Sequence, residues 1–329
     1  MKKSIVLITS LLLVIGSVSA APEISGSFGL DYTLGFDGTL TPSGVDSDLN
    51  AAEVSITLST DYWDLTLRDI AAAGSDVAAA VTLDVDALLE EVEIELPVEL
   101  DALVGNQNFF STSVYTDPSG AEGDYYCLYS ESISRGNLPF GLSVGYNDMI
   151  TVEGGIDVID GGKFMSVELY PAEGLSFAAN MASDATFDTY DIDGLAVTAS
   201  AAADITVLAD LDFDLSFSGA GWFAIDDASL NSYFVAVSGG KDAVSTYLEY
   251  TNEQGTSNVN VGAGYELSDA VSTSAGVNLA DVFNSLTFGA WASASYTIAD
   301  VTTFVTYGFS DNGTSLSDHY IQAGMDFDF

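Results

Sequence analysis

Hydrophobic and polar residues alternate with a period of two along most of the chain. The first segment places apolar or small residues at every even position from 24 to 36, and small, polar or acidic residues between them. Successive side chains of a β-strand point to opposite faces of the sheet. The segment therefore predicts a strand with one apolar face and one polar face.

The same alternation recurs in five further segments, and its period is that of strands rather than helices. The connections between candidate strands also alternate, since short links are followed by longer polar stretches, as in an up-and-down meander. The further strand segments are residues 54–58, 92–100, 207–217, 286–298 and 321–329; the short links are 61–64, 171–174, 203–204, 268–270 and 299–300; the longer stretches are 37–50, 183–194, 252–257 and 311–318.

The first twenty residues predict an export signal. Lys2 and Lys3 precede an apolar run over residues 5–15, and small residues follow up to Ala20. This order is typical of a cleaved secretory signal peptide, and the run is shorter than a membrane-spanning helix needs. We therefore expect a signal peptide over 1–20 and a single domain over 21–329, and no later window offers eighteen consecutive apolar residues.

Composition then removes several classes of function. The chain carries 49 Asp and Glu but 6 Lys and Arg, a formal charge of −43, so a nucleic-acid partner is not expected. Cys127 and His319 are the single cysteine and histidine, which excludes a disulfide framework and a multi-histidine zinc site. The chain has no Gly-x-Ser-x-Gly elbow, and residues 188–194 lack the spacing of a calcium loop. We expect neither an enzyme nor a cofactor nor a dedicated metal site.

The C-terminal strand carries a resemblance to a known class. The chain ends in Phe329, and apolar residues precede it at two-residue intervals, a pattern that resembles the assembly signal of Gram-negative outer-membrane barrels. With the signal peptide and the alternation, the whole mature chain resembles a bacterial general porin. The resemblance implies outer-membrane lipid, the barrel-assembly machinery and a homotrimer as partners. The expected signal residues are Tyr320, Ile321, Ala323, Met325, Phe327 and Phe329.

The chain also departs from general porins. Residues 137–141 are only faintly similar to the Pro-Glu-Phe-Gly-Gly stretch of the inward-folded loop in those proteins. General porins also carry an arginine cluster opposite that loop. Here only Arg68, Arg135, Lys163 and Lys241 are available after the signal peptide, so opposed rows of charge are not expected.

The resemblance implies an all-β transmembrane antiparallel up-and-down barrel in the cell outer membrane. About twenty strands can be marked, which is too many for the 309 residues that remain after cleavage if each spanning strand takes about 9–11 residues. Because bacterial barrels have even strand numbers, we expect about 16 strands, with 14 or 18 as alternatives. Within 78–104, Pro97 argues for a bulge or a strand end, residues 86–92 could be a helical turn, and residues 106–124 a loop.

Closure of such a sheet predicts a pore. In lipid every backbone polar group must be paired, so a spanning sheet has to close with its apolar face outward. Sixteen strands leave a water channel, and rings of carboxylates in it favour cations. The residues expected to line the pore are Asp31, Glu91, Glu93, Glu95, Asp210, Asp212, Asp214 and Asp326.

The expected function is passive diffusion of small hydrophilic solutes and ions, with a preference for cations. Two alternatives remain, a non-conducting adhesin or structural outer-membrane barrel and a secreted soluble all-β protein of a salt-loving organism. Hydration of the surface in high salt is likewise an alternative explanation of the total negative charge. It does not account for carboxylates that alternate in phase with apolar residues.

Overall fold

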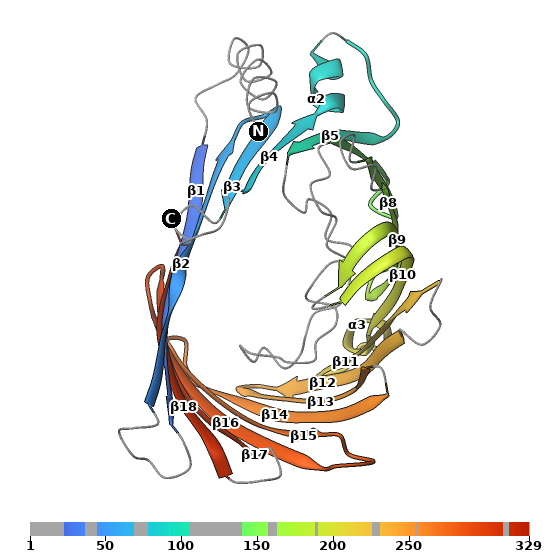
Figure 1. The fold of residues 1–329 in the computed structure, drawn as a ribbon. Helices are drawn as coiled ribbons and strands as arrows, with labels where there is room; N and C mark the ends of the chain where they lie inside the picture. The colour runs from blue at the N-terminus through green and yellow to red at the C-terminus, as the bar shows by residue number, and fades with distance from the viewer. Residues whose placement is uncertain are drawn as a thin grey trace.

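The computed structural model describes residues 23–36, 45–68, 78–91, 93–105, 140–156, 163–187, 190–225, 231–253, 255–311 and 316–328. These ranges form one antiparallel sheet of 18 strands, in which each strand pairs with its neighbours along the chain. The first and last strands also pair, through Ser27 opposite Asp328 to Phe36 opposite His319, so the sheet closes into a barrel (Figure 1). A closed barrel has no unpaired strand edge.

The strands and helices have the following bounds. They are β1 (Glu23–Phe36), β2 (Val45–Ser59), β3 (Trp63–Arg68), β4 (Ala78–Asp84), α2 (Val85–Glu90), β5 (Glu99–Gly105), β6 (Phe140–Tyr146), β7 (Ile150–Ile156), β8 (Lys163–Ala172), β9 (Leu175–Phe187), β10 (Tyr190–Asp204), α3 (Ile205–Ala209), β11 (Asp214–Ala224), β12 (Asn231–Lys241), β13 (Val244–Glu253), β14 (Thr256–Ser268), β15 (Val271–Ala280), β16 (Thr287–Ile298), β17 (Val301–Asp311) and β18 (Leu316–Asp328).

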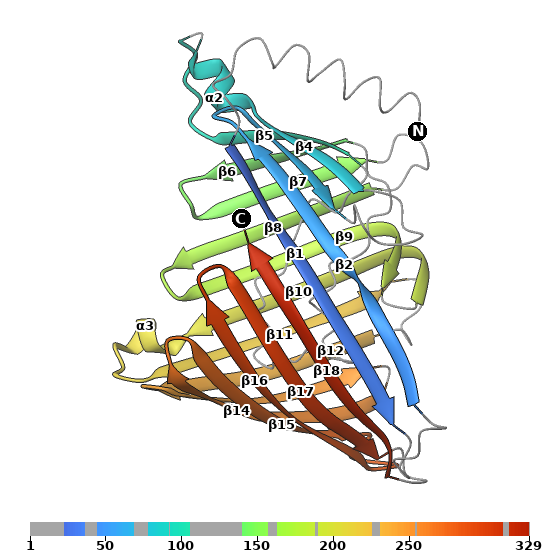
Figure 2. The ribbon, with the colours of Figure 1, turned by 90° about the vertical axis from the view of Figure 1, so that its left-hand side faces the viewer.

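One end of the barrel carries most of the tight connections, and we call it the short-turn end; at the other end, the links from β9 to β10 and from β13 to β14 are equally short. Two-residue turns join β8 to β9, β12 to β13, β14 to β15 and β16 to β17, and α2 and α3 lie at the same end (Figure 2). Gly174, Asp242 and Ala299 have φ of 78°, 54° and 51°, as tight hairpin turns require. The short links expected at 171–174, 268–270 and 299–300 are confirmed.

The expected number of about 16 strands is wrong, because the sheet has 18. Five strands, β3 to β7, are only six or seven residues long, so they use less chain than the expected spanning length. Segments expected as long loops are also largely strand, since β9 and β10 stay paired up to Phe187 opposite Tyr190. Likewise β2 begins at Val45, and β13 and β14 are paired up to Glu253 opposite Thr256.

Two helices affect expected strand segments, since α2 ends just before 92–100 and α3 covers the first residues of 207–217. The Asp84 carboxylate accepts a hydrogen bond from Ala87 N at 2.8 Å and begins α2, and the Asp204 carboxylate accepts one from Val207 N at 3.2 Å and begins α3. Capping by Asp204 therefore overrides the period-two pattern at the start of 207–217. Among the described residues of the expected strand 92–100, only Glu99 and Leu100 lie in a strand, β5. The helical turn considered for 86–92 is confirmed by α2, and the short link expected at 203–204 is wrong, because β10 extends to Asp204 and α3 follows.

β5 begins at Glu99, two residues after Pro97. The strand end that Pro97 indicated is therefore present. Neither helix in the described ranges has the length and apolar character needed to cross a bilayer. The expected signal peptide over 1–20, Cys127, Arg135, the loop over 106–124 and the start of the segment 188–194 fall outside the described residues.

Candidate channel

The outer face of the barrel is apolar and exposed. On β6, the alternate residues Phe140, Leu142, Val144 and Tyr146 expose 43%, 43%, 37% and 48% of their surface. The same alternation of exposed apolar side chains recurs on β14, β16 and β18. An exposed apolar surface that extends around the barrel is typical of a lipid-facing wall.

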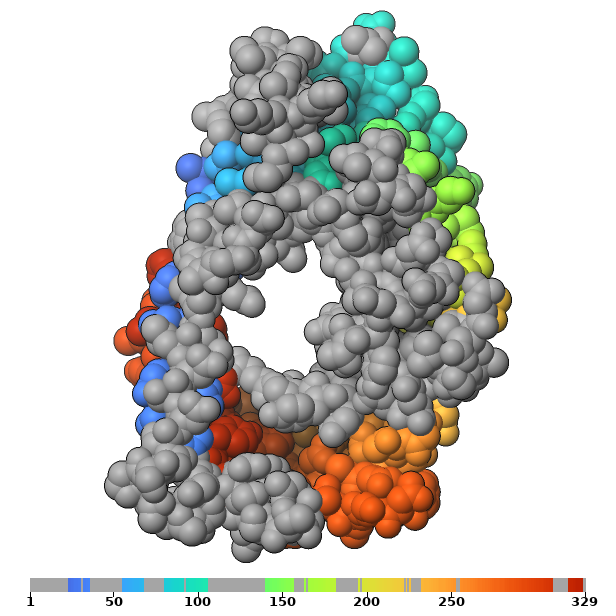
Figure 3. Space-filling view, viewed as in Figure 1, coloured from blue at the N-terminus to red at the C-terminus, as the bar shows by residue number. Residues whose placement is uncertain are grey.

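The opposite face of the sheet carries small and polar residues, and many of its longer side chains are acidic. Residues that are paired across neighbouring strands share a face of the sheet. The residues that alternate with the exposed apolar side chains therefore form the inner face on every strand. Its carboxylates in the described strands include Glu23, Asp64, Asp84, Glu99, Asp101, Glu153, Glu168, Asp204, Asp214, Glu249, Glu266 and Asp326. The space-filling view shows an opening through the molecule that this wall surrounds (Figure 3).

Asp214 and Asp326 of the expected pore residues lie in strands on the inner face. Asp326 is paired with Gly29, and a Cβ added to Gly29 would lie 3.0 Å from its carboxylate oxygen. Asp31 lies in β1 opposite Gly324, while its side chain falls outside the described residues.

The other five expected pore residues lie in connections at the short-turn end. Glu91 ends α2, Glu93 and Glu95 follow it, and Asp210 and Asp212 lie between α3 and β11. The Tyr62 hydroxyl donates to Glu91 at 2.7 Å, and this hydrogen bond, with some burial, raises the pKa of Tyr62. Asp212 forms an ion pair with Lys241 at 2.9 Å. A role for these five in the channel stays a prediction.

The residues of the expected assembly signal divide between the two faces of β18. Ile321, Met325 and Phe327 are exposed on the outer face, and Ala323 lies on the same face between Ile321 and Met325. Tyr320 is on the inner face beside Gly308 of β17, where a Cβ on the glycine would collide with its ring. Phe329 lies outside the described residues, and the assembly role stays a prediction.

Carboxylates are concentrated on the inner wall near the short-turn end of β3 to β5. Asp101 is paired with Asp84 across β4 and β5, and it interacts electrostatically with Asp64, Asp86 and Glu99 as well. Asp86 accepts a hydrogen bond from Leu100 N at 2.6 Å, which ties α2 to the start of β5. The closeness of these like charges produces a negative potential that attracts cations.

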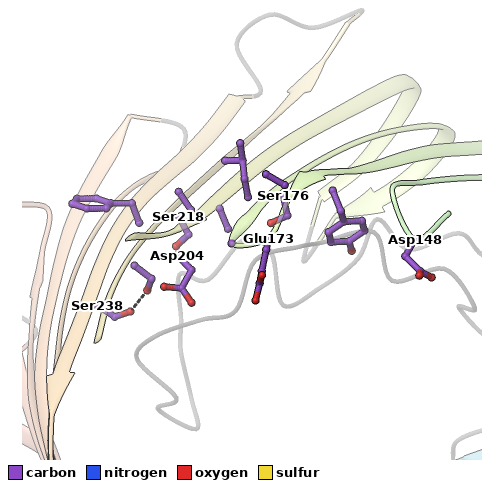
Figure 4. Close-up of a pocket in the computed structure, with 14 residues that line it drawn as sticks. Asp148, Glu173, Ser176, Asp204, Ser218 and Ser238 are labelled. Carbon is purple, nitrogen blue, oxygen red and sulfur yellow. Dashed lines mark hydrogen bonds between the residues drawn. The ribbon is translucent and has the colours of Figure 1, made fainter. Parts of the chain in front are cut away.

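Two adjoining hollows lie along the inner wall at the short-turn end. They have volumes of about 610 and 320 Å³, and both are lined by Asp148 and Tyr170. The larger hollow also contains Glu173 and Asp204, and Figure 4 shows these carboxylates on the same side of the sheet as several serines. The Tyr170 hydroxyl donates to Glu168 at 3.0 Å between the two hollows.

A hydrogen-bonded row of polar side chains crosses β13, β14 and β15 on the inner face. Asn278 Nδ2 donates to Asn260 Oδ1 at 2.6 Å, and Asn260 Nδ2 donates to Glu249 Oε1 at 2.9 Å. Glu249 is fully buried, and Asn260 is 5% exposed. Buried polar groups in a satisfied network hold a wall rigid, because each loses its hydration if a partner moves away.

Aromatic rings on the inner face cover glycines of neighbouring strands in the second half of the barrel. A Cβ on Gly276 would lie 2.7 Å from Trp291 Nε1, and a Cβ on Gly262 would collide with the Tyr247 ring. Phe304 covers Gly324 in the same way. These rings fill space over the glycines and stabilise strand pairing.

Within the part of the chain that the structure describes, no three His, Cys, Asp or Glu side chains are grouped closely enough to hold a metal ion. The His319 ring stacks on Tyr307 with 5.9 Å between centroids, and its Nδ1 lies 2.7 Å from the Tyr307 hydroxyl. Both residues are on strands at the outer apolar face, away from the inner carboxylates.

Sequence reasoning missed most of the inner carboxylates. Glu99 and Asp101 are in phase with Glu93 and Glu95, so extending the same alternation by a few residues would have found them. Glu168 lies between the apolar residues Val167 and Leu169 and carries the same signal. Asp148 and Glu173 lie in turns, where no periodicity marks the direction of a side chain.

The geometry is that of an antiparallel membrane-type β-barrel with a polar interior. The chain matches no protein-family model and no curated protein sequence. Among solved structures, it is similar to the outer membrane protein OpdK of Pseudomonas aeruginosa, with a TM-score of 0.58 and 10% identity over 93% of this chain and 99% of OpdK.

Two further outer-membrane structures are similar over nearly their full lengths. OpdQ of Pseudomonas aeruginosa has a TM-score of 0.59 at 8% identity, covering 94% of this chain and 98% of OpdQ. OccAB3 of Acinetobacter baumannii has a TM-score of 0.61 at 8% identity, covering 94% and 99%. These likenesses show the fold, and they confirm the resemblance to bacterial outer-membrane porins at the level of architecture.

Proposed function

We propose that this chain is an outer-membrane channel for passive diffusion of small hydrophilic solutes and ions, with a preference for cations. The observation that carries the proposal is a closed barrel of 18 strands with an apolar exterior and a carboxylate-bearing interior around an opening. Barrels of this size enclose water, and a polar lumen open at both ends conducts small solutes without chemistry. The proposed role is transport and not catalysis.

The sign of the interior charge supports the cation preference. The inner carboxylates face few cationic groups in the described residues, and Lys241 is engaged with Asp212. A structure of OpdK was solved with vanillate, which is a carboxylate anion. For the present chain we propose a preference for cations, because an inner wall with this many carboxylates repels anions.

The proposal extends to export, assembly and oligomeric state. The segment 1–20 is proposed to direct export and to be removed, and the apolar alternation that ends at Phe329 is proposed to be recognised by the barrel-assembly machinery. A homotrimer in contact with outer-membrane lipid is part of the same proposal. Electrophoresis of the unheated, detergent-extracted protein tests the trimer.

Conductance across a planar bilayer tests the function. The purified full chain should give stepwise current increases, and in a tenfold KCl gradient the reversal potential should have the sign of a potassium preference. A selectivity difference of about 1.4 kcal/mol corresponds to a tenfold permeability ratio. Equal permeability to potassium and chloride contradicts the cation preference, and absence of current favours a structural or adhesive barrel. Extraction of the protein without detergent favours the soluble alternative.

A further inference from the structure

The larger hollow of about 610 Å³ exists because the inner wall carries small side chains there. In the register of β9, β10 and β11, Ser176, Ala202 and Ser218 are opposite one another and form one row across the sheet. Neighbouring strands are about 4.8 Å apart, so the two hydroxyls of this row lie about 10 Å from each other with a methyl group between.

A second row, nearer the short-turn end, adds a charge to the hydroxyls. Asp204, Ser216 and Ser238 are opposite one another on β10, β11 and β12. The hydroxyls of Ser216 and Ser238 are hydrogen-bonded at 2.6 Å, and each keeps lone pairs for a ligand. The floor of the hollow therefore offers hydroxyl groups at several positions and a carboxylate at one side.

The rim of the hollow is acidic and held in place. Asp148 lies in the β6–β7 turn and Glu173 in the β8–β9 turn, and both are exposed. Asp204 N donates to Gly174 O at 2.7 Å, and one Asp204 carboxylate oxygen caps α3 through Val207 N. These bonds fix the turn after β8 against the end of β10, so Glu173 and Asp204 lie beside the same opening (Figure 4).

We propose that this hollow is a subsite for a protonated amine that carries several hydroxyl groups, the chemistry of an amino sugar. Its ammonium group would contact one of the rim carboxylates, Glu173 or Asp204, while Asp148 adds to the negative potential of the rim, and its hydroxyls would contact the serine floor. A volume of about 610 Å³ lies within the range typical of small-molecule sites. A bare inorganic cation would leave the serine floor unused, and a neutral sugar would leave the carboxylates unused. This inference rests on the proposed channel function and names a solute class for it.

Block of ion current measures such binding. The full chain in a planar bilayer is exposed, from each compartment in turn, to glucosamine, glucose or glucuronate, which have one ring size and three different charges. Glucosamine is expected to reduce the potassium current at a concentration about tenfold lower than glucose does, with glucuronate weakest. The block should be stronger from one compartment, because the hollow lies at one end of the barrel.

A charge-matched pair of variants separates local binding from the general field. The double variant Asp148→Asn and Glu173→Gln removes two rim charges, and asparagine tolerates the positive φ of 53° at residue 148. The control Asp242→Asn and Asp300→Asn removes two charges from other turns at the same end. The rim variant should raise the half-blocking glucosamine concentration about fivefold, and the control by less than about twofold, since exposed charges act weakly at a distance.

A third variant tests the hollow itself. Ser218→Val fills the floor without changing charge, and valine is suited to a strand. It should weaken block by glucosamine when the block is measured relative to the open-channel current of the same variant. Equal block by glucosamine and glucose, or equal effects of the rim and control variants, overturns the subsite while the channel stands. A protein that inserts but passes no current overturns the channel function and with it the subsite.

Discussion

The barrel wall has two parts that are built differently. The short wall, β3 to β7, has strands of six or seven residues, whereas the long wall, β8 to β18 together with β1 and β2, has strands of ten to fifteen. The inner face of the short wall is dominated by close carboxylates around Asp101. The inner face of the long wall carries hydrogen-bonded amides and hydroxyls, and aromatic rings over glycines.

This difference suggests a division of tasks. Carboxylates that lie close together repel one another, which destabilises the part of the barrel that carries them, but they also raise the local concentration of cations. Satisfied hydrogen-bond networks and covered glycines stabilise a wall and add little charge. We infer that the long wall supplies most of the rigidity of the barrel and that the short wall supplies most of its electrostatic preference.

The largest expected effect is on the stability of the long wall. Asn260→Leu removes the amide that links Glu249 to Asn278. The buried Glu249 carboxylate then loses this hydrogen-bond donor, and the free energy of unfolding should fall by about 3 kcal/mol. Urea unfolding in detergent micelles measures it. The control Thr297→Val breaks an exposed hydroxyl pair at 3.0 Å and should cost well under about 1 kcal/mol. Equal costs for both variants would show that the buried row does not stabilise the wall.

The next effect is on ion selectivity. Replacing Asp64, Glu99 and Asp101 together by their amides should lower the potassium-to-chloride permeability ratio about threefold, because their fields overlap. The same replacement at Asp214, Glu266 and Asp326 removes an equal charge from separate strands of the long wall and should lower the ratio less. Reversal potentials in a KCl gradient measure both ratios. A larger effect of the long-wall variant would reverse the assigned roles.

A smaller effect on stability than that of Asn260→Leu concerns the cap that joins the short wall to α2. Asp84→Ala removes the acceptor for Ala87 N and should cost about 1 kcal/mol. Asp84→Asn keeps a capping oxygen and removes one charge beside Asp101, so it should be at least as stable as the parent protein. The same unfolding measurement compares the two variants. A loss of stability in Asp84→Asn as large as in Asp84→Ala would mean that the charge, and not the cap, holds this junction.

Local pattern predicted much of the fold. The alternation around Phe28, Phe217, Phe288 and Phe327 predicted strands with one apolar face, because side chains of a strand necessarily alternate. It failed at the start of 207–217, where the Asp204 side chain bonds to the backbone three residues later and begins a helical turn. Alternation in the sequence cannot report that local competition.

Composition and the period of a strand were enough to predict the class of architecture, the sign of the charge and the two unlike faces of the wall. The number of 18 strands became known from the folded barrel, since it depends on how much chain each strand uses before it turns. The folded barrel also places particular carboxylates along one hollow, because Asp148, Glu173 and Asp204 are far apart in the sequence and reach the same opening only through the pairing of β6 to β10.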